Sequence, residues 1–150
     1  MMSLQTKMRL YGSVFMAISI LLGAFASHYL KTILESDSLA SFEVGVRYLV
    51  YHGLALLTLS NFTFNSFKRQ KQIVNILVVG CSLFSGSIFI LSFKEQFPFS
   101  VSGLGPITPI GGSLLILGCV LLIFQWIKTK NNQTFLFIVL FNILLNGHCH

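Results

Sequence analysis

Four uncharged apolar runs, separated by short polar segments, dominate the chain. They lie at residues 10–30, 48–67, 73–93 and 109–127. About 20 helical residues rise roughly 30 Å, which is the thickness of the hydrocarbon layer of a bilayer. Backbone groups in lipid must bond within their own segment, so each run is expected to be a helix. The pattern predicts an all-α fold, an integral membrane four-helix bundle with these four spans.

The segment between the first two runs has a different pattern. Phe42 and Val46 follow helical spacing, and Asp37 lies where a helix would be capped. Glu43 and Arg47 form an acid-first pair one helical turn apart, which favours a helix. We predict a short extracytoplasmic amphipathic helix that lies on the outer surface between spans 1 and 2.

The fourth run begins late, because Pro and Gly fill the string "GLGPITPIGGS". We expect Thr108 to cap this helix and Pro109 to take its first position, where no backbone donor is needed. Gly111 and Gly112 weaken the first turn, which is worthwhile only where another group approaches closely. That group is expected to be a side chain of another helix or a ligand.

Composition supports a membrane protein over a soluble one. The 150 residues are 54% hydrophobic and 9% charged, whereas a soluble domain has about 25% charged residues. The formal net charge is +6, but the ten Lys and Arg residues are scattered between apolar runs. A nucleic-acid partner is therefore not expected. The expected partner is the lipid bilayer, with a second copy of the chain or a larger membrane partner as further possibilities.

The basic residues predict the orientation. They are more frequent in the N-terminal tail, the second loop and the segment after the fourth run than in the first and third loops. Because basic loops remain in the cytoplasm, both termini are expected to be cytoplasmic, in a multi-pass protein of the cell inner (plasma) membrane. We expect a four-span membrane domain at 1–127 and a cytoplasmic or interfacial tail at 128–150, whose apolar stretch at 134–146 is too short to span comfortably.

The first run has an alternative interpretation. Basic residues, an apolar stretch and the string "AFA" at residues 24–26 resemble a signal peptide with its cleavage site. The run is longer than the usual core of a signal peptide, which favours a retained helix.

Two histidines are the main candidates for chemistry. His28 ends the first run and His52 follows the start of the second, so both are expected near the outer interface. With Tyr48 and Thr108 they form a candidate outer polar cluster. Ionisable residues in membranes are often functional, yet a histidine near a helix end commonly bonds to a neighbouring helix. No catalytic residue, metal site or cofactor is predicted, and the terminal string "GHCH" is expected to be incidental.

Small residues at helical spacing are expected to let helix backbones approach closely. They occur in the first run at Ser19, Gly23 and Ser27, in the third at Ser85, Gly86 and Ser87, and in the fourth at Gly111 and Gly112. A pore lining would need more polar residues along one face than these runs provide.

Four strings together resemble one family. "LGAFASHYLK", "VRYLVYHGLALL", "LFSGSIFIL" and "GPITPIGGSLLILG" follow the order of the motifs of the YgdD-like small membrane proteins, domain of unknown function 423, whose relatives include human transmembrane protein 256. The resemblance covers roughly residues 11–127. It implies a four-helix inner-membrane protein with a retained first helix, and it supplies no established reaction.

The family's recurring positions fall here on Gly23, Phe25, His28, Tyr48, His52, Ser85, Gly86, Ser87, Thr108, Pro109, Gly111 and Gly112. Some positions depart from the pattern. Ala26 and Ser27 stand where Gly-Ala is usual, and Cys119 where Trp often follows Gly. Leu49 stands where Gln is common, which removes a polar partner near His52.

Two functions are compatible with these observations. The four acidic residues all lie outside the span centres, which favours a non-enzymatic protein with a structural, accessory or envelope-integrity role. The alternative is a small transporter or ligand-binding membrane protein with a site at the outer ends of spans 1, 2 and 4, using His28, His52 and Thr108.

Overall fold

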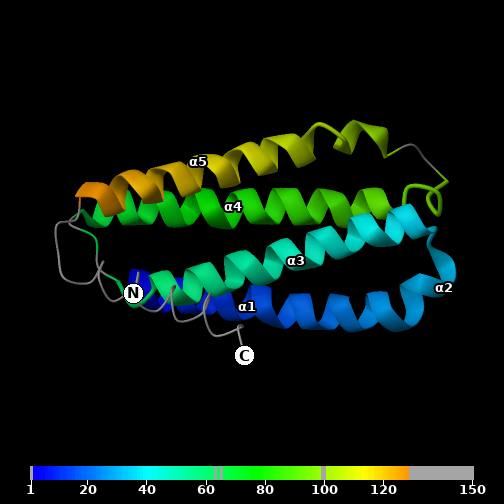
Figure 1. Cartoon of the computed structure of the whole chain (residues 1–150), viewed down its shortest axis with the longest axis horizontal. Helices are drawn as coiled ribbons and strands as arrows, with labels where there is room; N and C mark the ends of the chain where they lie inside the picture. The colour runs from blue at the N-terminus through cyan, green and yellow to red at the C-terminus, as the bar shows by residue number, and fades with distance from the viewer. Residues whose placement is uncertain (1, 63, 65, 99–100, 129–150) are drawn as a thin grey trace, which may run out of the picture.

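The computed structural model describes residues 2–62, 64, 66–98 and 101–128, and none of these residues lies in a strand. Four long helices run antiparallel along the molecule (Figure 1). They are α1 (Leu4–Phe25), α3 (Ser36–Leu59), α4 (Phe67–Ser92) and α5 (Ile107–Lys128). Shorter elements are the π-helix η1 (Ala26–Leu30), α2 (Lys31–Ile33) and the 3₁₀-helix η2 (Ser102–Leu104). The predicted all-α class is confirmed.

Three helical segments are long and apolar enough to cross a membrane. They are Leu4–Ile33, Phe67–Ser92 and Ile107–Ile127. The remaining long helix, α3, carries Glu43 and Arg47 within its length, joined by an ion pair of 3.8 Å. These charges lower the hydropathy of α3, which is not among the three segments.

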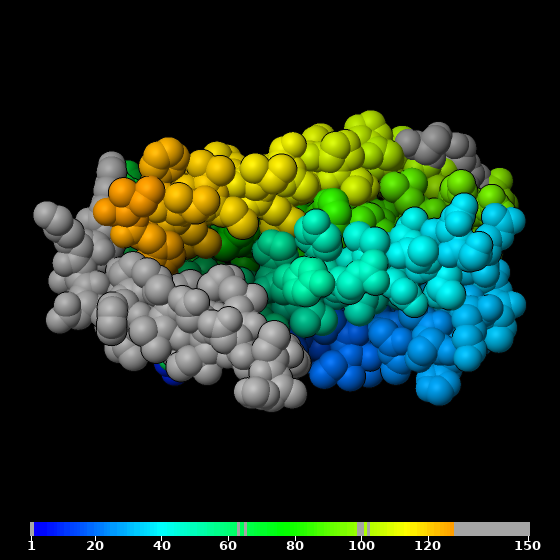
Figure 2. Space-filling view, viewed as in Figure 1, coloured from blue at the N-terminus to red at the C-terminus, as the bar shows by residue number. Residues whose placement is uncertain are grey.

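The helices pack in chain order, α1 on α3, α3 on α4 and α4 on α5. Met8, Leu56, Ile73 and Cys81 are fully buried between the first three of them. Outward side chains on α1 and α5 are large and apolar, and Figure 2 shows those of α5 in yellow and orange along one edge. The exposed ones include Leu10, Val14, Ile18, Leu21, Phe25, Ile110, Ile116, Leu117, Ile123 and Phe124.

Two helices begin earlier than the apolar runs predict. The Ser3 hydroxyl accepts a hydrogen bond from Thr6 N, so α1 begins before Arg9. The Ser66 hydroxyl accepts one from Arg69 N, so α4 begins before its basic residues. Both helices therefore extend beyond the predicted spans, which begin at residues 10 and 73. The physical reason is that long basic side chains reach water from a helix that continues beyond the hydrocarbon layer.

The second span differs at both ends from its predicted range of 48–67. Residues 36–47 form the first half of α3 without a break, where a separate surface helix is predicted. Phe42 is 2% exposed, and its ring centroid lies 4.8 Å from that of Phe89. At the other end α3 stops at Leu59, and the Ser60 and Asn61 side chains donate to the carbonyl of Leu57. The predicted tail, with its 134–146 stretch and terminal "GHCH", lies outside the described residues.

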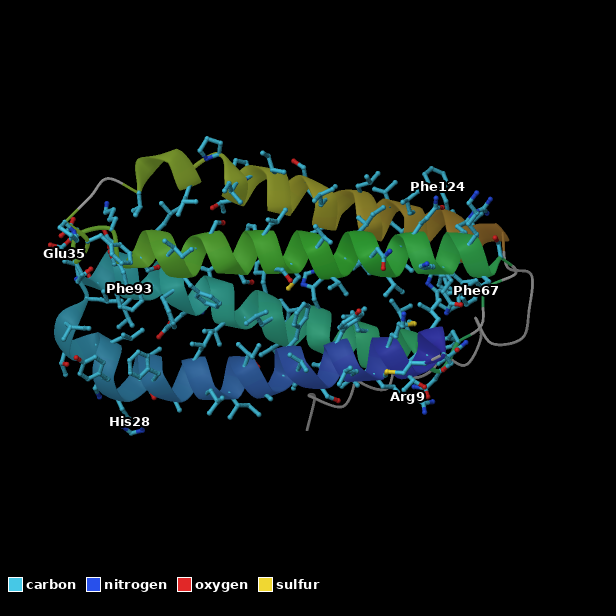
Figure 3. All side chains as sticks on the ribbon, turned by 180° about the vertical axis from the view of Figure 1, so that it is seen from behind. Arg9, His28, Glu35, Phe67, Phe93 and Phe124 are labelled. Atoms are coloured by element: carbon cyan, nitrogen blue, oxygen red, sulfur yellow. The ribbon has the colours of Figure 1, made fainter. Side chains whose placement is uncertain are left out.

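Polar bonds tie the helices together at the end that holds the N-terminus. Arg9 Nε donates to Ser60 Oγ at 3.3 Å, which joins α1 to the end of α3. Arg69 donates to Gln125 Oε1 at 3.4 Å, which joins α4 to α5. Figure 3 shows Arg9 and Phe67 at this end and His28 and Glu35 at the other. The end with the N-terminus therefore carries Arg9, and the opposite end carries His28 and Glu35.

Candidate functional site

The two histidines lie far apart. His28, in η1, is exposed and points away from the helices (Figure 3). His52 lies deep in α3, next to Gly53, which contacts Gly12 and Met16 of α1. Gly12 precedes His28 by more than four helical turns, which is about 24 Å at 1.5 Å per residue. His28 therefore takes no part in a cluster with His52, because α3 begins a dozen residues before the predicted start of the second span.

His52 belongs to a packed contact between α3 and α4. Its Nδ1 lies 2.9 Å from the Tyr48 carbonyl oxygen, and its ring stacks on Tyr48 with centroids 5.9 Å apart. Tyr48 in turn packs against Phe84 of α4 at 4.4 Å. The Cys81 Sγ donates to the same Tyr48 carbonyl at 3.6 Å. One ring nitrogen of His52 thus has a partner within its own helix, and the ring fills space beside Tyr48.

Thr108 joins α5 to α4 and does not cap its helix. α5 begins at Ile107, so Thr108 lies inside the first turn. Its hydroxyl lies 2.7 Å from Ser87 Oγ, which itself donates to the Phe84 carbonyl at 3.0 Å. Because the hydrogen of Ser87 is used, Thr108 donates to Ser87. Of the predicted outer cluster, Tyr48 and His52 meet on α3, and Thr108 bonds to α4 one turn from the Phe84 that Tyr48 contacts.

The predicted small packing residues of α4 and α5 behave differently from one another. A Cβ at Gly111 would lie 2.5 Å from Phe84 N and 3.0 Å from Gly80 O, so these backbones touch. A Cβ at Gly112 would lie 3.6 Å from the Phe84 ring, an ordinary contact. At Gly86 it would meet nothing within 4 Å, so Gly86 does not mediate packing among the described residues. Ser85 is 1% exposed and Ser87 4%, so both are buried, on different sides of α4.

On the first helix, Ser19 is buried and donates to the Met16 carbonyl. A Cβ at Gly23 would lie 3.7 Å from the side chain of Val46 in α3, which is an ordinary contact. Ser27 is exposed and donates to Ala24 O, so it packs against no other helix through this bond. The predicted stripe therefore contributes through Ser19 and, more weakly, through Gly23.

α1 and α3 approach closely at a pair of glycines that the predicted packing residues do not include. A Cβ at Gly12 would lie 2.8 Å from Gly53 O, and one at Gly53 would lie 3.1 Å from Gly12 O. A third close contact places Gly45 against the Phe89 ring. Gly53 directly follows His52 inside an apolar run, and a glycine at such a position indicates a close contact between helices.

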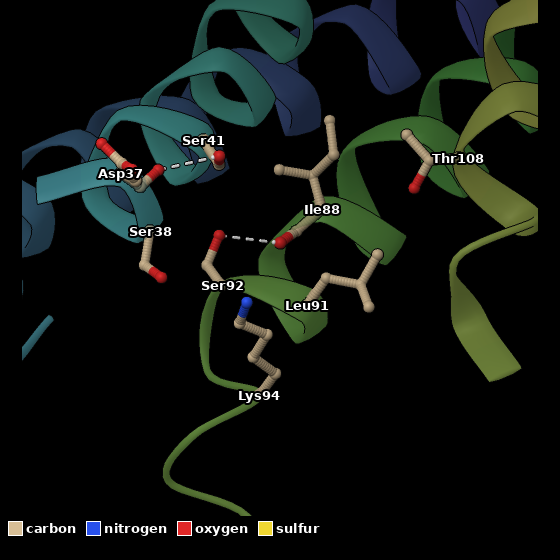
Figure 4. A pocket seen from close by; sticks show the side chains of 8 residues that line it. All are labelled: Asp37, Ser38, Ser41, Ile88, Leu91, Ser92, Lys94 and Thr108. Atoms are coloured by element: carbon tan, nitrogen blue, oxygen red, sulfur yellow. Dashed lines mark hydrogen bonds between the residues drawn. The ribbon is translucent and has the colours of Figure 1, made fainter. Parts of the chain in front are cut away.

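A polar cavity lies where the first turn of α3, the last turn of α4 and the first turn of α5 come together (Figure 4). Its volume is about 310 Å³. Polar side chains line it from all three helices and the turn after α4, namely Asp37, Ser38, Ser41, Ser92, Lys94 and Thr108. Ile88 and Leu91 supply an apolar wall, and apolar atoms make up most of the lining surface, so the name polar cavity refers to its six polar lining residues. Thr108 is the one lining residue that belongs to the predicted cluster. The other lining residues lie near helix ends, and the composition of the sequence does not single them out.

Comparison with known proteins places the chain in a family. Residues 22–112 match the family model described as "Protein of unknown function (DUF423)". The chain belongs to the DUF423 family. It is 32% identical over 112 residues to a UPF0382 membrane protein of Haemophilus influenzae, covering 75% of this chain and 86% of that relative. No solved structure matches the chain.

Further relatives come from other organisms. A UPF0382 membrane protein of Staphylococcus aureus is 34% identical over 106 residues, covering 71% of this chain and 83% of the relative. The UPF0382 membrane protein YwdK of Bacillus subtilis is 29% identical over 120 residues, covering 78% and 93%. With the three apolar helices, these names establish a membrane protein. The matched DUF423 region contains His52, the Gly111 contact and the whole lining of the polar cavity.

Proposed function

We propose that this DUF423 protein is a non-enzymatic scaffold or accessory protein of the inner (plasma) membrane that supports envelope integrity. The single observation that carries this proposal is where its small and polar residues lie. Gly12, Gly53 and Gly111 bring helix backbones together, and Thr108 bonds across a helix contact. The outward faces of α1 and α5 are apolar. Such a protein acts through its shape and lateral contacts, with lipid, a second copy of the chain or a larger membrane partner.

Four crossings are part of the proposal. The 24 residues of α3 rise about 36 Å, which is enough to span the hydrocarbon layer. α3 also packs along α1 and α4, both of which qualify as spans on their own. Arg9 and Arg69 lie at one end of the molecule, and basic residues favour the cytoplasmic side of the membrane. With four crossings, both termini are then cytoplasmic. Retention of the first helix is supported by α1 burying Met8 and Phe15 in the core.

A deletion strain of the producing cell tests this function. We expect it to admit a membrane-impermeant dye or lose detergent resistance, and the wild-type gene to restore the barrier. His52→Gln and its matched control His28→Gln should both restore it to the extent that they accumulate as folded protein, because neither side chain performs chemistry. A His52→Gln protein that inserts and melts like the wild type but restores nothing would contradict a purely structural role.

The second candidate function, a small transporter or ligand-binding protein, is favoured by the polar cavity. The cavity lies at the ends of α3, α4 and α5, and the predicted site was at the outer ends of spans 1, 2 and 4. α1 and its His28 contribute nothing to the cavity lining. The helix ends that support this candidate are therefore those of spans 2, 3 and 4.

A further inference from the structure

We infer that the polar cavity binds the phosphoethanolamine headgroup of a phospholipid. Asp37, Ser41 and Ser92 would hold the primary ammonium, and Lys94 the phosphate. This inference rests on the second candidate function, and it names the ligand class for that site.

The ammonium half of the site consists of hydrogen-bond acceptors. Ser41 Oγ donates to the Asp37 carbonyl at 2.9 Å, and Ser92 Oγ donates to the Ile88 carbonyl at 2.9 Å (Figure 4). Each hydroxyl hydrogen is used within its own helix, so the hydroxyl oxygens present lone pairs to the cavity. The Asp37 carboxylate adds two further acceptors. A group with several N–H donors and a positive charge, a primary ammonium, satisfies this arrangement.

The phosphate half of the site is positive. Lys94 follows the end of α4, and its side chain lies beside Ser92 (Figure 4). Thr108 belongs to the first turn of α5, whose backbone N–H groups and dipole favour an anion. Lys94 therefore adds a full charge to the partial charge of this helix end.

The opposite charges of Asp37 and Lys94 select for a zwitterion. No ion pair joins them among the residues that the structure describes, where the recorded pair is Glu43–Arg47. Both charges are thus available to a ligand. A simple anion would meet the carboxylate of Asp37, and a simple cation would meet the ammonium of Lys94, so each is disfavoured. A quaternary ammonium such as choline has no N–H to give to Asp37, Ser41 or Ser92.

The position of the cavity identifies the ligand as a lipid. It lies at the ends of α4 and α5, which are long and apolar enough to cross the bilayer, so a crossing by these two helices puts it at the depth of the headgroups. Its volume of about 310 Å³ is at the small end of ligand sites, as suits a headgroup. Ile88 and Leu91 form an apolar wall. Directly after Thr108, a shallow apolar groove of about 340 Å³ on α5 is lined by Pro109, Ile110, Ser113, Leu114 and Leu117, and it suits an acyl chain.

Native mass spectrometry of the full chain in detergent tests the inference. Phosphatidylethanolamine, phosphatidylcholine and phosphatidylglycerol of identical acyl chains are added in equal amounts, and bound lipid is counted. We expect phosphatidylethanolamine to bind in preference to the other two. Asp37→Asn should reduce its preference over phosphatidylcholine about fivefold, as for a partly exposed charge pair. Lys94→Gln should weaken both lipids by a similar factor.

Matched controls lie at the same end of the molecule. Glu35 and Lys31 are exposed and do not line the cavity, so Glu35→Gln and Lys31→Gln should bind lipid like the wild type. Equal binding of the three lipids, or an Asp37→Asn protein that keeps the preference, would overturn the inference. Free O-phosphoethanolamine that displaces the lipid at equal concentration would overturn the assignment to a lipid. A protein without lipid preference that still restores the barrier would leave the scaffold function standing.

Discussion

Neighbouring glycines in this chain have different physical roles. A side chain at Gly111 would clash with the backbone of Phe84, whereas a side chain at Gly112 would make an ordinary contact with the Phe84 ring. Gly86, in the second half of α4, has open space where a side chain would lie. Backbone atoms cannot move aside as the tip of a flexible side chain can, so Gly111 determines how closely α4 and α5 approach.

Gly111→Ala is expected to lower the free energy of unfolding by about 1–3 kcal/mol, because the added methyl group overpacks the contact with α4. Thermal unfolding in detergent measures the change. Gly112→Ala and Gly86→Ala are the matched controls, and they should be neutral or stabilising by up to about 1 kcal/mol, since Ala favours a helix over Gly. A Gly111→Ala protein that melts above both controls would contradict the backbone contact.

At the scale of elements, α3 carries an ion pair and also packs between α1 and α4. Its first half buries Phe42 against Phe89 and Phe93, with centroids 4.8 and 6.1 Å apart. Gly45 admits the Phe89 ring to the same interface. The exposed Glu43 and Arg47 pair lies on the other side of the helix. The apolar side of this half is the side that packs on α4, and the charged side is exposed.

Phe42→Ala is expected to lower the free energy of unfolding by about 3–5 kcal/mol, since it removes a buried ring from a packed contact. Phe67→Ala is the control, because Phe67 is 64% exposed at the start of α4. The pair is compared by thermal unfolding in detergent. Equal and small losses in the two proteins would mean that residues 36–47 lie on the membrane surface, away from α4.

The apolar pattern predicts that the long helices exist. It does not predict where they begin and end, or which residues form the cavity. Apolar runs reveal α1, α4 and α5, because lipid requires long uninterrupted segments. They do not reveal where α3 begins, since a helix that packs on a neighbour tolerates Glu43 and Arg47 beyond the hydrocarbon layer. Because α3 begins a dozen residues before the predicted span, His52 lies several helical turns from His28. The cavity residues Asp37 and Lys94 are ordinary loop-flanking charges until three helix ends bring them together.

At the scale of the whole molecule, α1 and α5 form the two edges of a row of helices. The extensive contacts join α1 to α3, α3 to α4 and α4 to α5. Each edge presents exposed apolar side chains, such as Ile18 and Leu21 on α1 and Ile116 on α5. Such edges suit lipid or a lateral partner, which agrees with the proposed scaffold role. This arrangement requires α3, the one of the four long helices that does not qualify as a span on its own, to cross the bilayer in the middle of the row.

The crossing of α3 is tested most directly by labelling single cysteines in intact cells. In a protein with Cys81, Cys119 and Cys149 replaced by serine, a cysteine is placed at Glu35, Lys68 or Glu95, all of which are exposed. We expect Glu35→Cys and Glu95→Cys to react with an impermeant maleimide from outside. Lys68→Cys should react only after the membrane is permeabilised. Glu35→Cys and Lys68→Cys reacting from the same side would contradict the four-span arrangement.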